Sequence, residues 1–326
     1  MLTYLTRRIL IGVFTLLAVT FIVYGLIRNM PGTPLTIMQE AVRMDALMSQ
    51  AQMDKLEAMY HLDKPWYIGY GYWLGNVLQG DFGRGIHDRR QVDVIIGERL
   101  PKTLMLTGTS LLLTYLLCVP LGLYTTATAG TLRERFISTF LYVLYALPTF
   151  VAAVYLNLVI AVQWELLPLY GTTSEGYAQM STWGKIQDVI AHAILPVFCL
   201  TYGSLAYYTR FIKSNMMETV QQDYIRTAKA KGASPRTILV VHAFRNSLIP
   251  LVTMVGLTLP ALLAGSVILE TIYQWNGFGY LFYQSITMRE YPVIMGLVLM
   301  FSVMTLLGQL LADVLYAIVD PRITYS

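Results

Sequence analysis

Six stretches of the chain contain no Asp, Glu, Lys or Arg and are apolar over nearly their whole length. They cover Ile9–Ile27, Thr103–Leu132, Phe136–Trp164, Val189–Thr209, Asn246–Leu269 and Tyr291–Ala312. The shortest has 19 residues, close to the roughly 20 that an α-helix needs to cross about 30 Å of hydrocarbon. The pattern therefore predicts an all-α integral membrane protein with six transmembrane helices.

Composition supports a membrane protein and excludes other classes. Of the 326 residues, 56% are hydrophobic and only 13% are charged, which is too apolar for an ordinary soluble domain. The net charge of +4 is divided among loops instead of forming a basic stripe, so nucleic acid is a poor partner. Cys118 and Cys199 both lie in apolar runs, and no disulfide framework or metal motif follows from them.

Basic residues indicate the orientation of the spans. Twelve lie in segments expected on the inside, and only Lys185 and Arg289 lie in the short outer loops. Lys and Arg are retained on the cytoplasmic side, so both termini are predicted to be cytoplasmic. The apolar run of the first span is too long for a cleaved signal peptide, and we expect this helix to be retained.

These assignments divide the chain into three parts. Residues 1–27 form a cytoplasmic N-terminus and the first transmembrane helix. Residues 28–102 form a small helical extracytoplasmic segment, whose closely spaced aromatic residues suit either the membrane–water interface or contact with a delivery protein. Residues 103–326 form a five-helix core with a cytoplasmic loop at 210–245.

The stretch Asp223–Pro250 is the most informative part of this loop. Asp223 is a candidate N-cap of a short helix, and Gly232 a candidate left-handed stop. Ser234 and Pro235 then suit the start of a second helix. Tyr224, Ile225 and Ala228 are expected to share one face of the first helix. One interpretation is a basic loop that only obeys the positive-inside rule; the other is a folded element that docks in a partner's groove.

The same stretch resembles the EAA loop of ABC importer permeases, and in particular the dipeptide and oligopeptide class. Tyr224–Gly232 is similar to that class's Y-I-R-T-A-x-A-K-G pattern, and His242–Pro250 to its H-A-x-R-N-x-x-x-P pattern. Arg226 and Arg245 depart from the broader importer pattern, which has Glu and Pro at these places. Leu62–Gly85, the run that follows Glu270, and Val319–Arg322 also resemble the peptide class.

The resemblance implies a type I ABC importer permease fold and a loop that couples to an ATPase. The implied coupling residues are Asp223, Tyr224, Ile225, Arg226, Thr227, Ala228, Lys229, Ala230, Lys231, Gly232, Ser234 and Pro235. It further implies a second homologous permease subunit, two ATPase subunits, an extracytoplasmic solute-binding protein and a peptide substrate. The expected location is a bacterial or archaeal cytoplasmic membrane.

No G-x-x-x-x-G-K-[ST] run occurs in the chain, so we expect ATP hydrolysis in a partner subunit and neither catalytic residues nor a cofactor here. The four histidines have no metal-ligand spacing. Two alternatives remain at this stage. One is an importer of the same architecture for nickel chelates or oligosaccharides. The other is an ion-coupled secondary transporter, which is disfavoured because no acidic residue lies in the middle of a predicted span.

Overall fold

The structure is a computed structural model that describes residues 2–31, 57–58, 60–245 and 265–319, together with residues 247, 251, 254 and 258. All regular elements of this described part are helical. In chain order they are α1 (Leu2–Arg28), α4 (Trp66–Leu78), α5 (Val92–Ala127), α6 (Leu132–Ala146), α7 (Thr149–Leu156), η1 (Asn157–Gln163), η2 (Tyr177–Gln179), α8 (Thr182–Val220), α9 (Asp223–Ala230), α10 (Pro235–Thr237), η3 (Ile238–Phe244), α12 (Val267–Ile272), α13 (Phe278–Thr287) and α14 (Tyr291–Val319).

Four of the predicted spans correspond to single long helices: α1, α5, α8 and α14 are each long and apolar enough to cross a membrane. Pro120 in α5 and Pro196 in α8 lie inside continuous helices, as is tolerated where neighbouring helices satisfy the freed carbonyls. The predicted fifth span, Asn246–Leu269, falls almost entirely outside the described residues.

The predicted third span, Phe136–Trp164, is not one straight helix. It is divided into α6 and the α7–η1 helix, which meet at 85° around Leu147 and Pro148. Proline disfavours helical geometry in the residue before it, and Leu147 accordingly has an extended ψ of 116°. Tyr202 of α8 supports the break, because its hydroxyl donates to the carbonyl of Leu147 at 3.2 Å.

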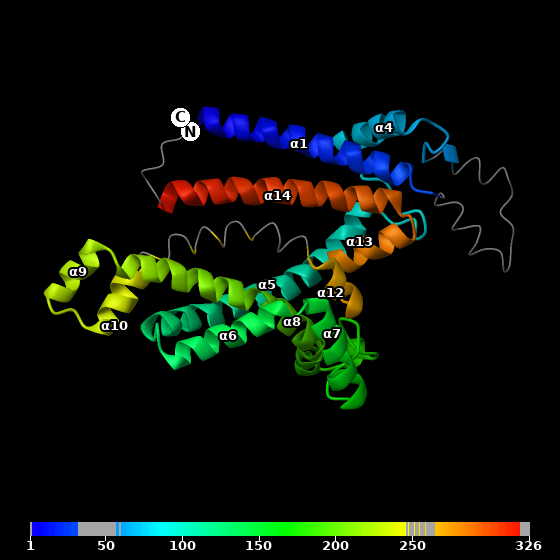
Figure 1. Cartoon of the computed structure of the whole chain (residues 1–326). Helices are drawn as coiled ribbons and strands as arrows, with labels where there is room; N and C mark the ends of the chain where they lie inside the picture. Colours follow the sequence, from blue (N-terminus) through cyan, green and yellow to red (C-terminus); the bar gives the residue numbers. More distant parts are fainter. Residues whose placement is uncertain are drawn as a thin grey trace.

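The helices form two groups, which Figure 1 shows one above the other. α5 and α8 pack along each other and carry α6 and α7 on their outer side. α1 packs on α14, where Gly12 lies so close to Leu306 that any larger residue would overlap it. α14 also contacts α5, which joins the two groups.

The α4 helix carries the aromatic cluster and packs against α1. Tyr70 is buried there, and its hydroxyl lies 3.0 Å from the Thr20 hydroxyl of α1. Trp66 and Trp73 are half-buried beside it, whereas Tyr67 and Tyr72 remain exposed. Packing within the chain therefore accounts for part of the cluster, and the suggested contact with a delivery protein stays a prediction.

Two short helices, α12 and α13, form a turn over the start of α5. The indole N–H of Trp275, a fully buried residue, donates to the carbonyl of Lys102 at 2.9 Å. The backbone N–H of Phe278 donates to the Thr103 hydroxyl at 2.7 Å. These bonds hold the turn against α5 and satisfy two donors, a buried indole N–H and the first backbone N–H of α13.

Candidate functional site

The predicted coupling loop begins where α8 ends. α8 has 39 residues, which at 1.5 Å per residue gives a helix of about 58 Å. This is nearly twice the roughly 30 Å of hydrocarbon. α8 therefore holds α9 beyond the end of the bundle, on the same side as the start of α1 and the end of α14 (Figure 1).

The start of α9 corrects one prediction. The N-cap residue is Gln222, and no side chain accepts a capping hydrogen bond. Asp223 is the first helical residue, and its carboxylate instead pairs with Arg226 one turn later, at 3.1 Å. Both side chains are highly exposed, so the pair contributes at most about 0–1 kcal/mol. Asp223 still suits the first turn, where a negative charge complements the helix dipole.

The end of α9 confirms the predicted stop at Gly232. The residue has φ +81°, the left-handed region that glycine adopts at lowest cost. Its N–H bonds to the carbonyl of Lys229 at 3.0 Å, and the N–H of Ala233 bonds to that of Ala228 at 3.1 Å. These two bonds define a Schellman motif, which satisfies the carbonyls left open at a helix C-terminus.

A second helical segment starts as predicted. The Ser234 hydroxyl accepts from the N–H of Thr237 at 3.2 Å, and Pro235 occupies the first helical position. The chain then continues from α10 directly into the π-helical turn η3. The loop is therefore a folded helix–turn–helix element.

The predicted apolar face of α9 is split in two. Ile225 is fully buried and α9 lies against η3, so this side chain anchors the helix to its own chain. Tyr224 is one residue, or 100°, further round the helix and is 45% exposed. Ala228 lies between them and is half-buried. The other side chains of α9, from Asp223, Arg226, Thr227, Lys229 and Ala230, are exposed.

Sequence reasoning did not find an ion pair that connects α6 to α8 near the same end of the bundle. Lys213 of α8 donates to the Glu134 carboxylate at 2.6 Å, and Glu134 also accepts from the Ser138 hydroxyl at 2.7 Å. A cavity of about 440 Å³ lies beside the pair. The detectable signal was the Thr131–Glu134 spacing of a helix start, in which the Thr131 hydroxyl accepts the Glu134 N–H.

A second cavity missed by the sequence lies between α5 and α8. Its volume is about 250 Å³. The lining residues that the structure describes carry no charged side chain and are rich in hydroxyl groups, those of Thr107, Ser110, Thr114, Ser204, Tyr208, Thr258 and Ser266. The hydroxyls of Ser110 and Thr114 donate to carbonyls one turn earlier in α5, each at 2.8 Å. Such bonds satisfy the hydroxyl hydrogen and leave the oxygen able to accept another bond.

The long apolar helices of the described part are those of a multi-pass membrane protein. Residues 118–325 match the family model described as "binding-protein-dependent transport system inner membrane component". The chain belongs to this family.

Curated relatives align with the chain over its whole length. The oligopeptide transport system permease protein AppB of Bacillus subtilis is 37% identical over 326 residues, covering 100% of both chains. The dipeptide transport system permease protein DppB of Escherichia coli K12 is 31% identical, and the glutathione transport system permease protein GsiC of Salmonella typhimurium is 33% identical. Both alignments cover 100% of each chain.

A solved structure shows the same fold. An inward-facing structure of the MetNI methionine ABC transporter has a TM-score of 0.54 at 19% identity, covering 69% of this chain and 96% of that one. The fold is that of a type I ABC importer permease. Membership of the family, together with the long apolar helices, makes the chain a multi-pass protein of the inner membrane.

Proposed function

We propose that this chain is a transmembrane subunit of an ATP-driven importer of di- and oligopeptides and that it couples to separate ATPase subunits through α9. The names of the relatives support the peptide class over nickel chelates or oligosaccharides, because their systems are described as transporting oligopeptides, dipeptides and glutathione. The family membership supports a binding-protein-dependent mechanism over an ion-coupled carrier. The expected partners are a second homologous permease, two ATPase chains and an extracytoplasmic solute-binding protein.

One observation supports the coupling role: a short helix whose exposed face lies beyond the bundle is held by the buried Ile225 on one side and by the Gly232 turn at its end. Tyr224 supplies an aromatic contact, and Lys229 and Lys231 supply positive charge. An amphipathic helix of this kind suits insertion into a groove of a partner. Closure of the ATPase pair would then move α9 and α8 together as a rigid body.

The hydroxyl-lined cavity between α5 and α8 is our candidate for part of the translocation pathway. Neutral hydroxyl groups can form hydrogen bonds with a peptide backbone but offer no ion pair that would hold it tightly. High affinity for the peptide should therefore reside in the solute-binding protein. We expect the permease pair without that protein to bind peptide more weakly than micromolar. Micromolar binding to the isolated pair in isothermal titration calorimetry would contradict this division of roles.

The decisive experiment is reconstitution in proteoliposomes. With the second permease, the ATPase subunits and the solute-binding protein, uptake of a labelled dipeptide should require ATP hydrolysis. The same vesicles with an ATPase variant that cannot hydrolyse ATP are the matched control. Peptide uptake driven by a proton or sodium gradient, in vesicles that contain the permeases alone, would show the ion-coupled carrier instead.

A further inference from the structure

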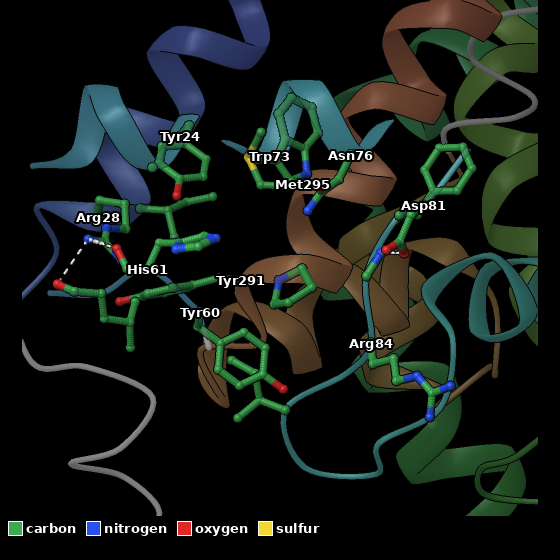
Figure 2. A pocket seen from close by; sticks show the side chains of 17 residues that line it. Tyr24, Arg28, Tyr60, His61, Trp73, Asn76, Asp81, Arg84, Tyr291 and Met295 are labelled. Atoms are coloured by element: carbon green, nitrogen blue, oxygen red, sulfur yellow. Dashed lines mark hydrogen bonds between the residues drawn. The ribbon is translucent and has the colours of Figure 1, made fainter. Parts of the chain in front are cut away.

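A cavity of about 320 Å³ lies at the end of the molecule opposite α9, and its residues have no part in the proposed coupling. It is enclosed by the end of α1, by α4, by the 81–86 loop and by the start of α14 (Figure 2). Its volume is within the range of small-molecule sites, about 300–1,000 Å³. The aromatic rings of Tyr24, Tyr60, Trp73 and Tyr291 line it.

Arg28 is the fixed cation of this cavity. Its Nη2 donates to the carbonyls of His61, Leu62 and Lys64 at 3.0–3.2 Å, which holds the guanidinium at the cavity wall. Figure 2 shows Arg28 beside His61. Carbonyl oxygens orient the charge without neutralising it. Among the described residues, Arg28 has no carboxylate within ion-pair distance, and its Nη1 is buried without a hydrogen-bond partner.

Tyr60 provides a second group in need of a partner. Its hydroxyl is buried and has no hydrogen-bond partner within the part of the chain that the structure describes. Burial raises the pKa of the Tyr60 phenol, so the group stays protonated and able to donate. A buried donor that remains unpaired is unfavourable, and a ligand with a suitable oxygen would satisfy it.

The charged side chains of the described lining are Arg28, Arg84 and Asp81, so positive charge exceeds negative charge by one. Asp81 and Arg84 both line the cavity, but the Asp81 carboxylate already accepts the N–H of Gly83 at 2.8 Å. Within the described part of the chain, Arg28 is thus left without a carboxylate partner. Guanidinium groups bind phosphate oxygens strongly, because the hydrogen bonds are charge-assisted and geometrically matched.

The surroundings indicate where such an anion comes from. Arg28 ends a membrane-spanning helix, and α1 exposes large apolar side chains just before it, with Ile22 58% and Leu26 64% exposed. Aromatic rings beside a terminal arginine are typical of the membrane–water interface. A ligand at this depth would have its polar part in the cavity and its apolar part along α1.

We propose that this cavity binds the phosphodiester headgroup of an anionic membrane lipid, with Arg28 holding the phosphate and Tyr60 donating to a second headgroup oxygen. The site goes beyond the proposed transport function, because none of its groups lies in the hydroxyl-lined cavity or in the coupling loop. The bound lipid would fix α4 to the ends of α1 and α14.

The test uses the assembled transporter, purified with its partner subunits, stripped of lipid and titrated in neutral detergent. Native mass spectrometry should detect one phosphatidylglycerol per copy of this chain, retained in preference to phosphatidylcholine. Arg28→Gln should weaken that binding at least about tenfold, because a charge-assisted contact is lost. Tyr60→Phe should weaken it about fivefold, the equivalent of one neutral hydrogen bond.

Three further variants keep the test independent of folding. Asn76 lines the cavity with an exposed side chain, so Asn76→Trp should block headgroup binding without removing a charge or a core residue. Lys185→Gln and Tyr67→Phe remove a cation and a hydroxyl that do not line the cavity, and both should bind like the wild type.

Three outcomes would overturn the proposal. The first is equal phosphatidylglycerol binding by the wild type, Arg28→Gln and Asn76→Trp. The second is equal binding of free glycerol 3-phosphate, which would indicate a site for a soluble anion. The third is displacement of the lipid by a dipeptide, which would indicate a peptide subsite. ATP-dependent peptide uptake is measured separately, so failure of the lipid site leaves the proposed transport function standing.

Discussion

The carboxylate of Glu270 accepts a hydrogen bond from the backbone N–H of Gly279 at 2.9 Å, across the turn between α12 and α13. It also accepts from the N–H groups of Tyr280 and Ser266, both at 3.2 Å, and is fully buried. Glycine is needed beside it, because a Cβ at Gly277 would lie only 2.5 Å from the carboxylate. One acid thus organises the turn that closes over α5.

The burial of Glu270 should make the stability of the protein depend on pH. Burial raises its pKa to about 7, against the smaller lowering effect of the three N–H donors. A raised carboxyl pKa means that the folded state holds its proton more tightly than the unfolded state. Protonation of Glu270 therefore contributes to the free energy of unfolding. The contribution is complete below about pH 4.5, is lost as the pH rises towards 7, and amounts to about 3 kcal/mol.

The measurement is thermal unfolding of the detergent-solubilised chain between pH 4.5 and 8, for the wild type and Glu270→Gln. Gln cannot titrate, and its amide has one acceptor oxygen for three N–H groups, so the variant should be less stable at every pH. Its unfolding temperature should also fall less steeply with rising pH. Parallel curves for the two proteins would mean that Glu270 does not titrate in this range.

Tyr224→Ala should weaken association with the ATPase, because it removes the one aromatic side chain of α9, which is exposed. Its neighbour Ile225 is the internal anchor, so Ile225→Ala should instead loosen α9, at a cost of about 2–5 kcal/mol. Ala228→Trp should also impair association, since overpacking costs about 1–3 kcal/mol. The assay is a pull-down of ATPase chains from solubilised membranes, together with peptide uptake.

The control for these variants is Tyr67→Ala, which removes an exposed tyrosine from α4, at the opposite end of the molecule. All four variants should insert at normal abundance. Full ATPase association and full peptide uptake by both Tyr224→Ala and Ala228→Trp would contradict the coupling role. The loop would then be only a basic loop that obeys the positive-inside rule.

Gly232→Ala should destabilise the α9 turn through backbone strain alone. A Cβ at Gly232 would meet no atom within 4 Å, but φ is +81°. The expected cost is about 1 kcal/mol, and more for the β-branched Gly232→Val. Gly97→Ala is the matched control, because Gly97 lies in α5 with equally open surroundings and no positive φ. Hydrogen exchange of α9 should increase only in the Gly232 variants; equal exchange in the Gly97 variant would refute the strain argument.

The predicted topology can be tested with single cysteines. The native Cys118 and Cys199 are fully buried, so the background with an impermeant thiol reagent should be low. Lys185→Cys should react with the reagent added outside the cell, and Lys229→Cys should not. Cysteine at Gln52 should also react, although this residue lies outside the described part of the chain. Labelling of Lys229→Cys in sealed, right-side-out cells would reverse the predicted orientation.

The sequence by itself determined the features that depend on the composition of one segment or on interactions between residues close together in the chain. Charge-free runs identified α1, α5, α8 and α14, because burying a charge in hydrocarbon is costly wherever the helix packs. The stop at Gly232 and the start at Ser234 were predictable, because each needs only its nearest residues.

Tertiary structure decided everything that depends on which elements meet. The burial of Ile225 required η3 beneath it, and the break at Leu147 is stabilised by Tyr202, 55 residues away. Asp223 was predicted as a cap, but an exposed carboxylate can pair with Arg226 at little cost, so sequence rules did not decide between the two. Arg28 and Tyr60 share a cavity because the chain folds back so that α4 packs on α1 and α14. Such contacts are set by packing between distant segments, and residue spacing along the chain carries no record of them.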